Sequence, residues 1–170
     1  MTDMKTAIMD AAEKRMQAGG FGGFSFREIA ADVGIKSSSV HYHFPTKEDL
    51  AAAVIRRWSE RVFKGVEERL QQDPDPIRVW TKTFRRTAFS DRHMCPCTVL
   101  AASSHDLPEP VAVEVKRFFA MCQEKIVAAG LSPEKAAEFL STIIGALVVA
   151  NALRDAEEYD RATQALMASA

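Results

Sequence analysis

Glycine and proline clusters divide this chain into segments with a helical repeat, and this punctuation limits its fold more than any other feature. The clusters fall at residues 19–23, 73–76 and 108–110. Between them, apolar residues recur at three- and four-residue spacing, and no window alternates polar and apolar residues as a half-buried strand does. The sequence therefore predicts an all-α fold of about nine helices.

Length and hydropathy limit the class of protein further. The chain has 170 residues, 47% of them hydrophobic, which is enough for one sizeable core or for a small module attached to a larger one. Its first twenty residues carry charges throughout, and the longest apolar run, residues 143–150, is far shorter than the roughly 20 residues that span a bilayer. We expect a cytoplasmic protein with no membrane partner, whose three cysteines stay reduced.

Two short helices joined by a glycine turn follow the first helix. One opens at Ser25, and Glu28 stands three residues later, at the spacing of a capping box. It ends at Gly34, since glycine adopts the left-handed conformation at little cost, and a new helix begins near Lys36. Two helices joined in this way form a helix-turn-helix, whose second helix can enter the major groove of DNA.

The second of these helices, residues 36–44, carries an outward face suited to nucleic acid. Val40 and Phe44 lie one turn apart and face inward. Small hydroxyl side chains allow close approach to base edges and bond to donors or acceptors there, whereas acidic residues would repel phosphate. The segment contains no acid, and its outward residues are Ser37, Ser38, His41 and Tyr42.

The next helix begins with a second capping box. Thr46 is the expected cap, and Asp49 stands at the reciprocal position. Lys47 then lies in the first turn, where free N–H groups and the helix dipole already favour an anion. We interpret Lys47 as a phosphate anchor.

Bulk charge does not support DNA binding. The net charge is −1, and the first fifty residues hold six Lys or Arg against seven Asp or Glu, again a balance of −1. Binding to DNA then requires that the cations gather on one face while the acids lie elsewhere.

The stretch from Phe24 to Leu50 resembles the DNA-binding region of the TetR family of repressors. The matching parts, in the family's spacing, are Ile29-Ala30, Val33-Gly34-Ile35, Val40, Tyr42-His43-Phe44 and Pro45-Thr46-Lys47-Glu48-Asp49-Leu50. The resemblance implies base-edge contacts from Ser37 and Ser38. It implies phosphate contacts from Ser25, Lys36, His41, Tyr42, His43, Thr46 and Lys47.

Some of these assignments have alternatives. The family often has a phosphate-contacting tyrosine where His41 stands, with Tyr42 next to it, so either ring is a candidate for the main contact. Ser25 and Thr46 are alternatively helix caps and nothing more. His43 is alternatively a packing residue under the first helix.

Longer helices follow, and residues 51–170 form the expected second domain. We assign residues 1–50 to a three-helix DNA-binding domain and residues 51–170 to a helical ligand-sensing and dimerisation domain. The helices are expected at about residues 5–18, 25–33, 36–44, 47–70, 77–89, 98–104, 111–129, 134–154 and 156–168. The last two are apolar enough to join a homodimer, as the family resemblance also implies.

The resemblance further implies a repressor that leaves palindromic double-stranded operator DNA when a small-molecule inducer binds the second domain. The fourth helix would transmit that event between the domains. The pocket candidates are Trp58, Trp80, Phe84, Cys97, Phe119 and Cys122. Aromatic residues at helical spacing are more often plain core, and the sequence does not identify the inducer.

The cysteines allow two other interpretations. His93, Cys95, Cys97 and Cys122 are soft ligands in sufficient number for zinc, but Cys-x-Cys is not the usual structural spacing, so we expect no metal and no cofactor. Alternatively, Cys95 or Cys97 is a thiol sensor of oxidants or electrophiles, with a thiolate favoured by Arg92 or His93. An inert buried cysteine is the simpler interpretation.

Two other classes of function are weaker. No nucleophile elbow, phosphate-binding glycine loop or His-Glu-x-x-His motif occurs, so we expect no enzyme. A helix-turn-helix used for protein contacts is the remaining alternative. The salt dependence of the affinity for DNA distinguishes the two functions, because each neutralised phosphate releases counterions and makes the affinity fall with salt.

Overall fold

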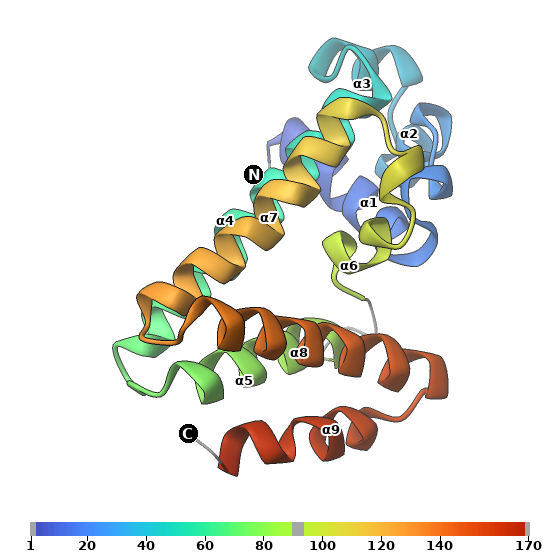
Figure 1. The fold of residues 1–170 in the computed structure, drawn as a ribbon. Coiled ribbons are helices and arrows are strands. Elements are labelled where there is room, and N and C mark those ends of the chain that lie inside the picture. The colour runs from blue at the N-terminus through green and yellow to red at the C-terminus, as the bar shows by residue number, and fades with distance from the viewer. Residues whose placement is uncertain (1–2, 90–93, 169–170) are drawn as a thin grey trace. The chain divides into compact units, whose positions relative to one another are not determined.

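The computed structural model describes residues 3–89 and 94–168, which form nine α-helices and no strand (Figure 1). This confirms the predicted all-α class. The helices are α1 (Met4–Gly19), α2 (Phe26–Val33), α3 (Ser37–His43), α4 (Lys47–Leu70), α5 (Pro76–Phe89), α6 (Pro96–Ala101), α7 (Glu109–Ala128), α8 (Pro133–Leu153) and α9 (Ala156–Ala168). Two short 3₁₀ turns, Phe21–Gly23 and Ser104–Asp106, accompany them.

The sequence located these helices closely, except around α6. A helix was expected at residues 98–104, but α6 begins at Pro96, with Cys95 as its N-cap. Proline is favoured in the first turn because its missing N–H would have no partner there. The chain leaves the α-helix after Ala101, and Ser104–Asp106 forms a separate 3₁₀ turn.

The chain divides into two compact units. Unit 1 comprises Met1–Ser59 and Cys95–Arg117, and unit 2 comprises Glu60–Met94 and Phe118–Ala170. The helices α4 and α7 therefore contribute residues to both units. The predicted domain boundary at residue 50 separates functions and not compact units. The division into a DNA-binding domain and a ligand-sensing domain stays a prediction.

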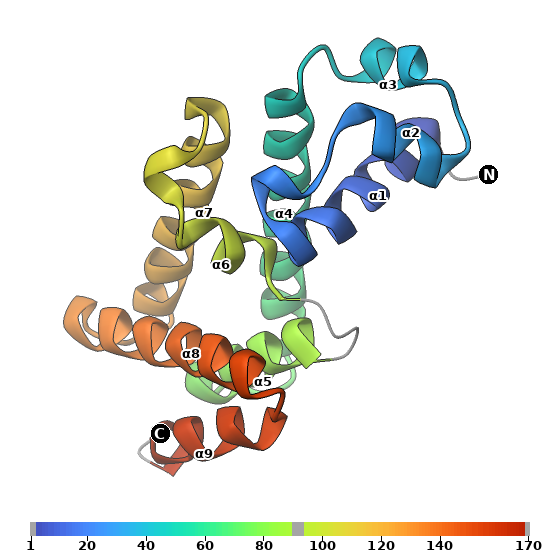
Figure 2. The same ribbon diagram turned by 90° about the vertical axis from the view of Figure 1, so that its right-hand side faces the viewer.

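Unit 1 contains the helix-turn-helix. In Figure 2, α1, α2 and α3 follow one another at the N-terminal end of this unit, and contacts join α1 to α2, α2 to α3 and α1 to α6. Their inner faces bury apolar side chains that have no exposed surface, including Ile8, Met16, Ile29 and Val40. Burying one such side chain contributes about 1.5–3 kcal/mol, so this small core holds the orientation of α3.

Unit 2 is built on α8, which packs against α5 and α9 (Figure 1). Ser132 caps α8 by accepting a hydrogen bond from the Lys135 N–H at 3.3 Å, and Pro133 occupies the first turn. Among the described residues, α8 alone is long and apolar enough to cross a membrane, a property it shares with core helices of soluble proteins. Its contacts with α5 and α9 agree with a core helix.

Candidate nucleic-acid interface

The turn between α2 and α3 has the geometry that the glycine predicted. Gly34 adopts a left-handed conformation, with φ 75° and ψ 34°. Its N–H donates to the Ala31 carbonyl at 3.3 Å, and the Ile35 N–H donates to the Ala30 carbonyl at 2.9 Å. Two carbonyls in the last turn of α2 are thus satisfied, and α3 starts three residues after Gly34 as the second helix of a helix-turn-helix.

The outer face of α3 is polar and accessible. Val40 is completely buried and Phe44 is 4% exposed, so the apolar stripe faces the core as predicted. Lys36, Ser38, His41 and Tyr42 are exposed, and Ser37 is half-buried at the start of the helix. Because α3 carries no acid, this face presents hydroxyls, rings and a cation to a partner.

The structure distinguishes the two adjacent rings of α3. The imidazole of His41 packs edge-on against the Phe26 ring, with centroids 4.6 Å apart. Tyr42 touches the His43 ring at 5.2 Å but keeps 84% of its surface exposed. The Tyr42 hydroxyl is therefore the group more available to a phosphate.

The hydroxyls of the two predicted caps already have partners. Ser25 accepts a hydrogen bond from the Glu28 N–H at 3.3 Å and donates to the Glu28 carboxylate at 2.8 Å. Thr46 accepts from the Asp49 N–H at 3.1 Å and donates to the Asp49 carboxylate at 2.7 Å. Both residues cap helices, and a phosphate contact by either stays a prediction.

Lys47 has an environment that sequence reasoning missed. Its ammonium lies 4.4 Å from the ring centroid of Phe21 and 4.7 Å from that of Phe24. The electron-rich ring faces attract the cation and hold it at the first turn of α4. The only signal in the sequence was the pair of phenylalanines flanking the glycine cluster.

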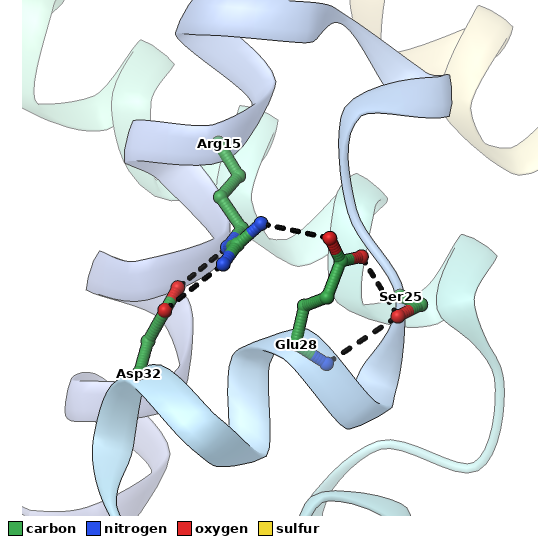
Figure 3. Close-up of polar contacts among 4 residues, drawn as sticks. All are labelled: Arg15, Ser25, Glu28 and Asp32. Atoms are coloured by element: carbon green, nitrogen blue, oxygen red, sulfur yellow. Dashed lines mark hydrogen bonds and ion pairs between the residues drawn. The ribbon is translucent and has the colours of Figure 1, made fainter.

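The acids of α2 are neutralised by α1. Arg15 binds Asp32 through two hydrogen bonds of 2.5 and 2.9 Å and reaches Glu28 at 3.1 Å (Figure 3). The hydrogen bond from Arg15 lowers the pKa of Asp32. The hydrogen bond from Ser25, helped by the charge of Arg15, lowers the pKa of Glu28. Both acids are thus kept ionised and paired.

A second arginine neutralises acids of α1. Arg57 of α4 lies 2.8 Å from Asp10 and 3.0 Å from Glu13. Four of the seven acids in the first fifty residues therefore have an arginine partner on α1 or α4. This pairing reduces the negative charge near the helix-turn-helix, and a basic face for DNA stays a prediction. It also leaves Arg27, exposed in the first turn of α2, as a candidate that sequence reasoning did not single out.

The six pocket candidates fall into both units. Trp58 and Cys97 belong to unit 1, whereas Trp80, Phe84, Phe119 and Cys122 belong to unit 2. Within unit 2, the rings of Trp80 and Phe84 stack with centroids 6.0 Å apart. A ligand pocket formed by these residues therefore stays a prediction.

Two further phenylalanines join the rings of unit 2. Phe63 of α4 lies 6.4 Å from Trp80 and 5.7 Å from Phe118 of α7, measured between ring centroids. Phe118 in turn meets Phe119 at 5.2 Å. Phe63 was missed because it stands one position off the four-residue apolar stripe of its helix.

The three cysteines are buried and form no disulfide. Burial acts to raise the pKa of Cys95, but hydrogen bonds from Cys97 and Thr98 outweigh it, so the pKa lies below its ordinary value. Within residues 3–89 and 94–168, no group of three or more His, Cys, Asp or Glu side chains is arranged to hold a metal ion. His93 lies outside the described residues.

Fold and surface together define a DNA-binding transcription regulator of the helix-turn-helix class. The family model of bacterial regulatory proteins of the tetR family matches residues 8–54. The helix-turn-helix regulator LmrA of Bacillus subtilis is 26% identical over 156 residues, which cover 86% of this chain and 82% of the relative.

Solved structures agree over nearly the whole chain. A TetR regulator from Agrobacterium tumefaciens has a TM-score of 0.86 and 26% identity, covering 97% of this chain and 96% of its own. One from Legionella pneumophila has a TM-score of 0.85 and 25% identity, covering 99% and 98%. Residues 8–54 thus carry the DNA-binding domain of the TetR family, and the chain as a whole is similar to regulators of that family. Regulators of this family bind operator DNA and act as dimers.

Proposed function

We propose that this chain is a homodimeric repressor that leaves a palindromic operator when a small-molecule inducer binds its C-terminal helical domain. The observation that carries DNA binding is the outer face of α3, which is exposed, polar and without acids. Ser37 and Ser38 are the proposed readers of base edges, because short hydroxyl side chains can approach them closely.

The proposed phosphate contacts surround this helix. Tyr42 is the main one, because it is 84% exposed while His41 packs on Phe26. Lys47 anchors a second phosphate from its position between two rings. The other proposed contacts are Ser25, Lys36, His41, His43, Thr46 and Arg27.

The proposed dimer forms through α8 and α9. Large apolar side chains are exposed near the end of α8, where Val148, Val149 and Leu153 are 48%, 53% and 60% exposed, and Met167 of α9 is 38% exposed. Clustered exposed apolar side chains are characteristic of surfaces that bind a partner. A two-fold axis would then present two α3 helices to half-sites about 34–36 Å apart.

The proposed location of this regulator is the cytoplasm.

Fluorescence anisotropy tests the proposal. Purified protein is titrated into DNA from upstream of its own gene and into a scrambled duplex of equal length, each at two salt concentrations. We expect tight binding to the upstream DNA only, with an affinity that falls steeply with salt. Weak binding that salt leaves unchanged would contradict DNA binding and favour a protein-interaction module.

A further inference from the structure

Among the described residues, three buried polar groups on α5 lack hydrogen-bond partners, and two of them, on Trp80 and Thr83, lie on one face of the helix. The Trp80 side chain is completely buried and Thr83 is 3% exposed. Among the described residues, neither the Trp80 Nε1–H nor the Thr83 hydroxyl has a partner. A buried donor that leaves water without gaining a partner destabilises the fold, so such groups are uncommon without a role.

Other buried hydroxyls in the same unit have partners. Thr163 donates to the Tyr159 carbonyl at 2.8 Å, and the Tyr159 hydroxyl donates to the Thr81 carbonyl at 2.9 Å. The first bond lies within α9 and the second joins α9 to α5, and each satisfies a buried hydroxyl. Within the described part of the chain, Trp80, Thr81 and Thr83 of α5 lack such a partner.

The two donors share a helix face that adjoins aromatic rings. Residues three and four apart lie on the same side of a helix, so Thr83 and Phe84 lie on the side of Trp80. The Trp80 ring contacts Phe84 and Phe63, and Phe63 stacks on Phe118. We name Phe63, Trp80, Phe84 and Phe118 the α5 aromatic cluster.

Charge around the α5 aromatic cluster limits what it can accept. Among the described residues, the only buried charged side chain is Glu114, which belongs to unit 1 and binds Arg56. Lys125 lies 5.5 Å from the Phe63 ring, but its ammonium is partly exposed and binds Glu67 at 2.6 Å. A charged molecule entering the cluster would lose its hydration without gaining a counter-charge, so a neutral one is favoured.

We propose that the α5 aromatic cluster binds a neutral, flat aromatic ketone whose carbonyl oxygen accepts hydrogen bonds from Trp80 and Thr83. A carbonyl oxygen has two lone pairs, which matches two donors on one helix face. The rings of the cluster pack against the aromatic body. The inference rests on the proposed function, since it names the chemical class of the inducer.

Calorimetric titration of the full chain tests this with three naphthalenes. The ketone 2-acetylnaphthalene is compared with 2-ethylnaphthalene, which has a similar shape without the acceptor, and with the anion 2-naphthoate. We expect the ketone to bind about tenfold more tightly than the ethyl compound, because only the ketone satisfies the buried donors. We expect no binding of 2-naphthoate.

Three variants assign the donors. Trp80→Phe and Thr83→Val each remove one donor and keep the shape, so each should weaken ketone binding about fivefold and leave the ethyl compound unchanged. Thr81→Val is the matched control. The Thr81 hydroxyl is also buried without a partner, but it lies about 100° around the helix from Trp80. If Thr83→Val fails to fold, Thr83→Ser should retain the preference for the ketone, and its loss there would contradict the role of the hydroxyl.

Equal affinity for the ethyl compound and the ketone, no binding of either, or an equal loss in Thr81→Val would each overturn the inference. The proposed function is tested separately, by adding the ketone to the protein–DNA complex. Binding of the ketone without release of DNA would contradict the induction mechanism while leaving the ligand class supported.

Discussion

The helices α3 and α5 carry the same kinds of side chain, hydroxyls and aromatic rings, in opposite environments. On α3 these side chains face water, and its one fully buried side chain is Val40. On α5 the indole of Trp80 and the hydroxyl of Thr83 are buried and have no partner among the described residues. The polar groups of a surface helix bond to water until DNA binds. Buried donors without partners cannot do this, so a ligand that supplies acceptors stabilises them. The comparison teaches that a DNA-binding region is recognised by exposed polar side chains, whereas a region that binds a small molecule is recognised by buried polar groups without partners.

The largest expected effect comes from the turn that presents α3. Gly34 has φ 75°, and no atom lies within 4 Å of a Cβ built there, so the cost of substitution is conformational. Gly34→Val should lower the free energy of unfolding by about 1–2 kcal/mol, measured by urea denaturation. Gly34→Asn is the control, since asparagine tolerates this conformation better, and equal losses in both variants would contradict the argument.

Removal of a hydroxyl should have opposite consequences at the start of α4 and within α5. Thr46→Ala deletes a capping bond to Asp49 and should lower the free energy of unfolding by about 1 kcal/mol. Thr83→Val replaces an orphan hydroxyl by a methyl group and should leave stability unchanged or raise it. Thermal unfolding of both variants without ligand checks this contrast, which fails if Thr83→Val is destabilised as much as Thr46→Ala.

The two rings at the end of α3 should differ in DNA affinity. Tyr42→Phe removes an exposed hydroxyl and should weaken operator binding about threefold to tenfold. His41→Gln should have a smaller effect, because the imidazole packs on Phe26. Anisotropy titrations at one salt concentration compare them, and a larger loss for His41→Gln would reverse the assignment.

Base and phosphate contacts should respond differently to salt and sequence. Lys47→Met should weaken binding to all DNA sequences alike and reduce the salt slope by about one. Ser38→Ala should relax base preference and leave the slope unchanged. Titrations on operator and scrambled DNA across four salt concentrations separate the two, and identical behaviour of both variants would refute this division of roles.

The smallest effect concerns an ion pair of unit 2. Arg85 donates to Asp160 at 2.6 and 2.7 Å, and this hydrogen bonding lowers the pKa of Asp160. The pair therefore stabilises the fold above the unfolded-state pKa of about 4, and the stabilisation is lost as pH falls through the lower folded-state pKa. Both side chains are more than 40% exposed, so the effect is small. Arg85→Met should flatten the acid side of a stability–pH curve relative to Lys82→Met, an exposed neighbour.

Sequence reasoning worked best where structure depends on neighbouring residues. The Ser25 and Thr46 caps, the left-handed Gly34 and the Ser132-Pro133 helix start each depend on residues two to four positions apart. It was wrong at α6, where the proline start was overlooked. Local hydrogen-bonding rules therefore account for most of the helices and for the helix-turn-helix.

The sequence by itself determined the all-α class, the helix-turn-helix and the polar outer face of α3, because each follows from helical periodicity and local capping. Only the tertiary structure decided that Arg15 neutralises Asp32 seventeen positions away, since a salt bridge between helices depends on how they pack. Packing likewise placed Lys47 between two rings and brought Phe63 beside Trp80. It alone left donors of Trp80, Thr81 and Thr83 on α5 buried without hydrogen-bond partners among the described residues, because burial and hydrogen bonding are properties of the assembled core rather than of any sequence window.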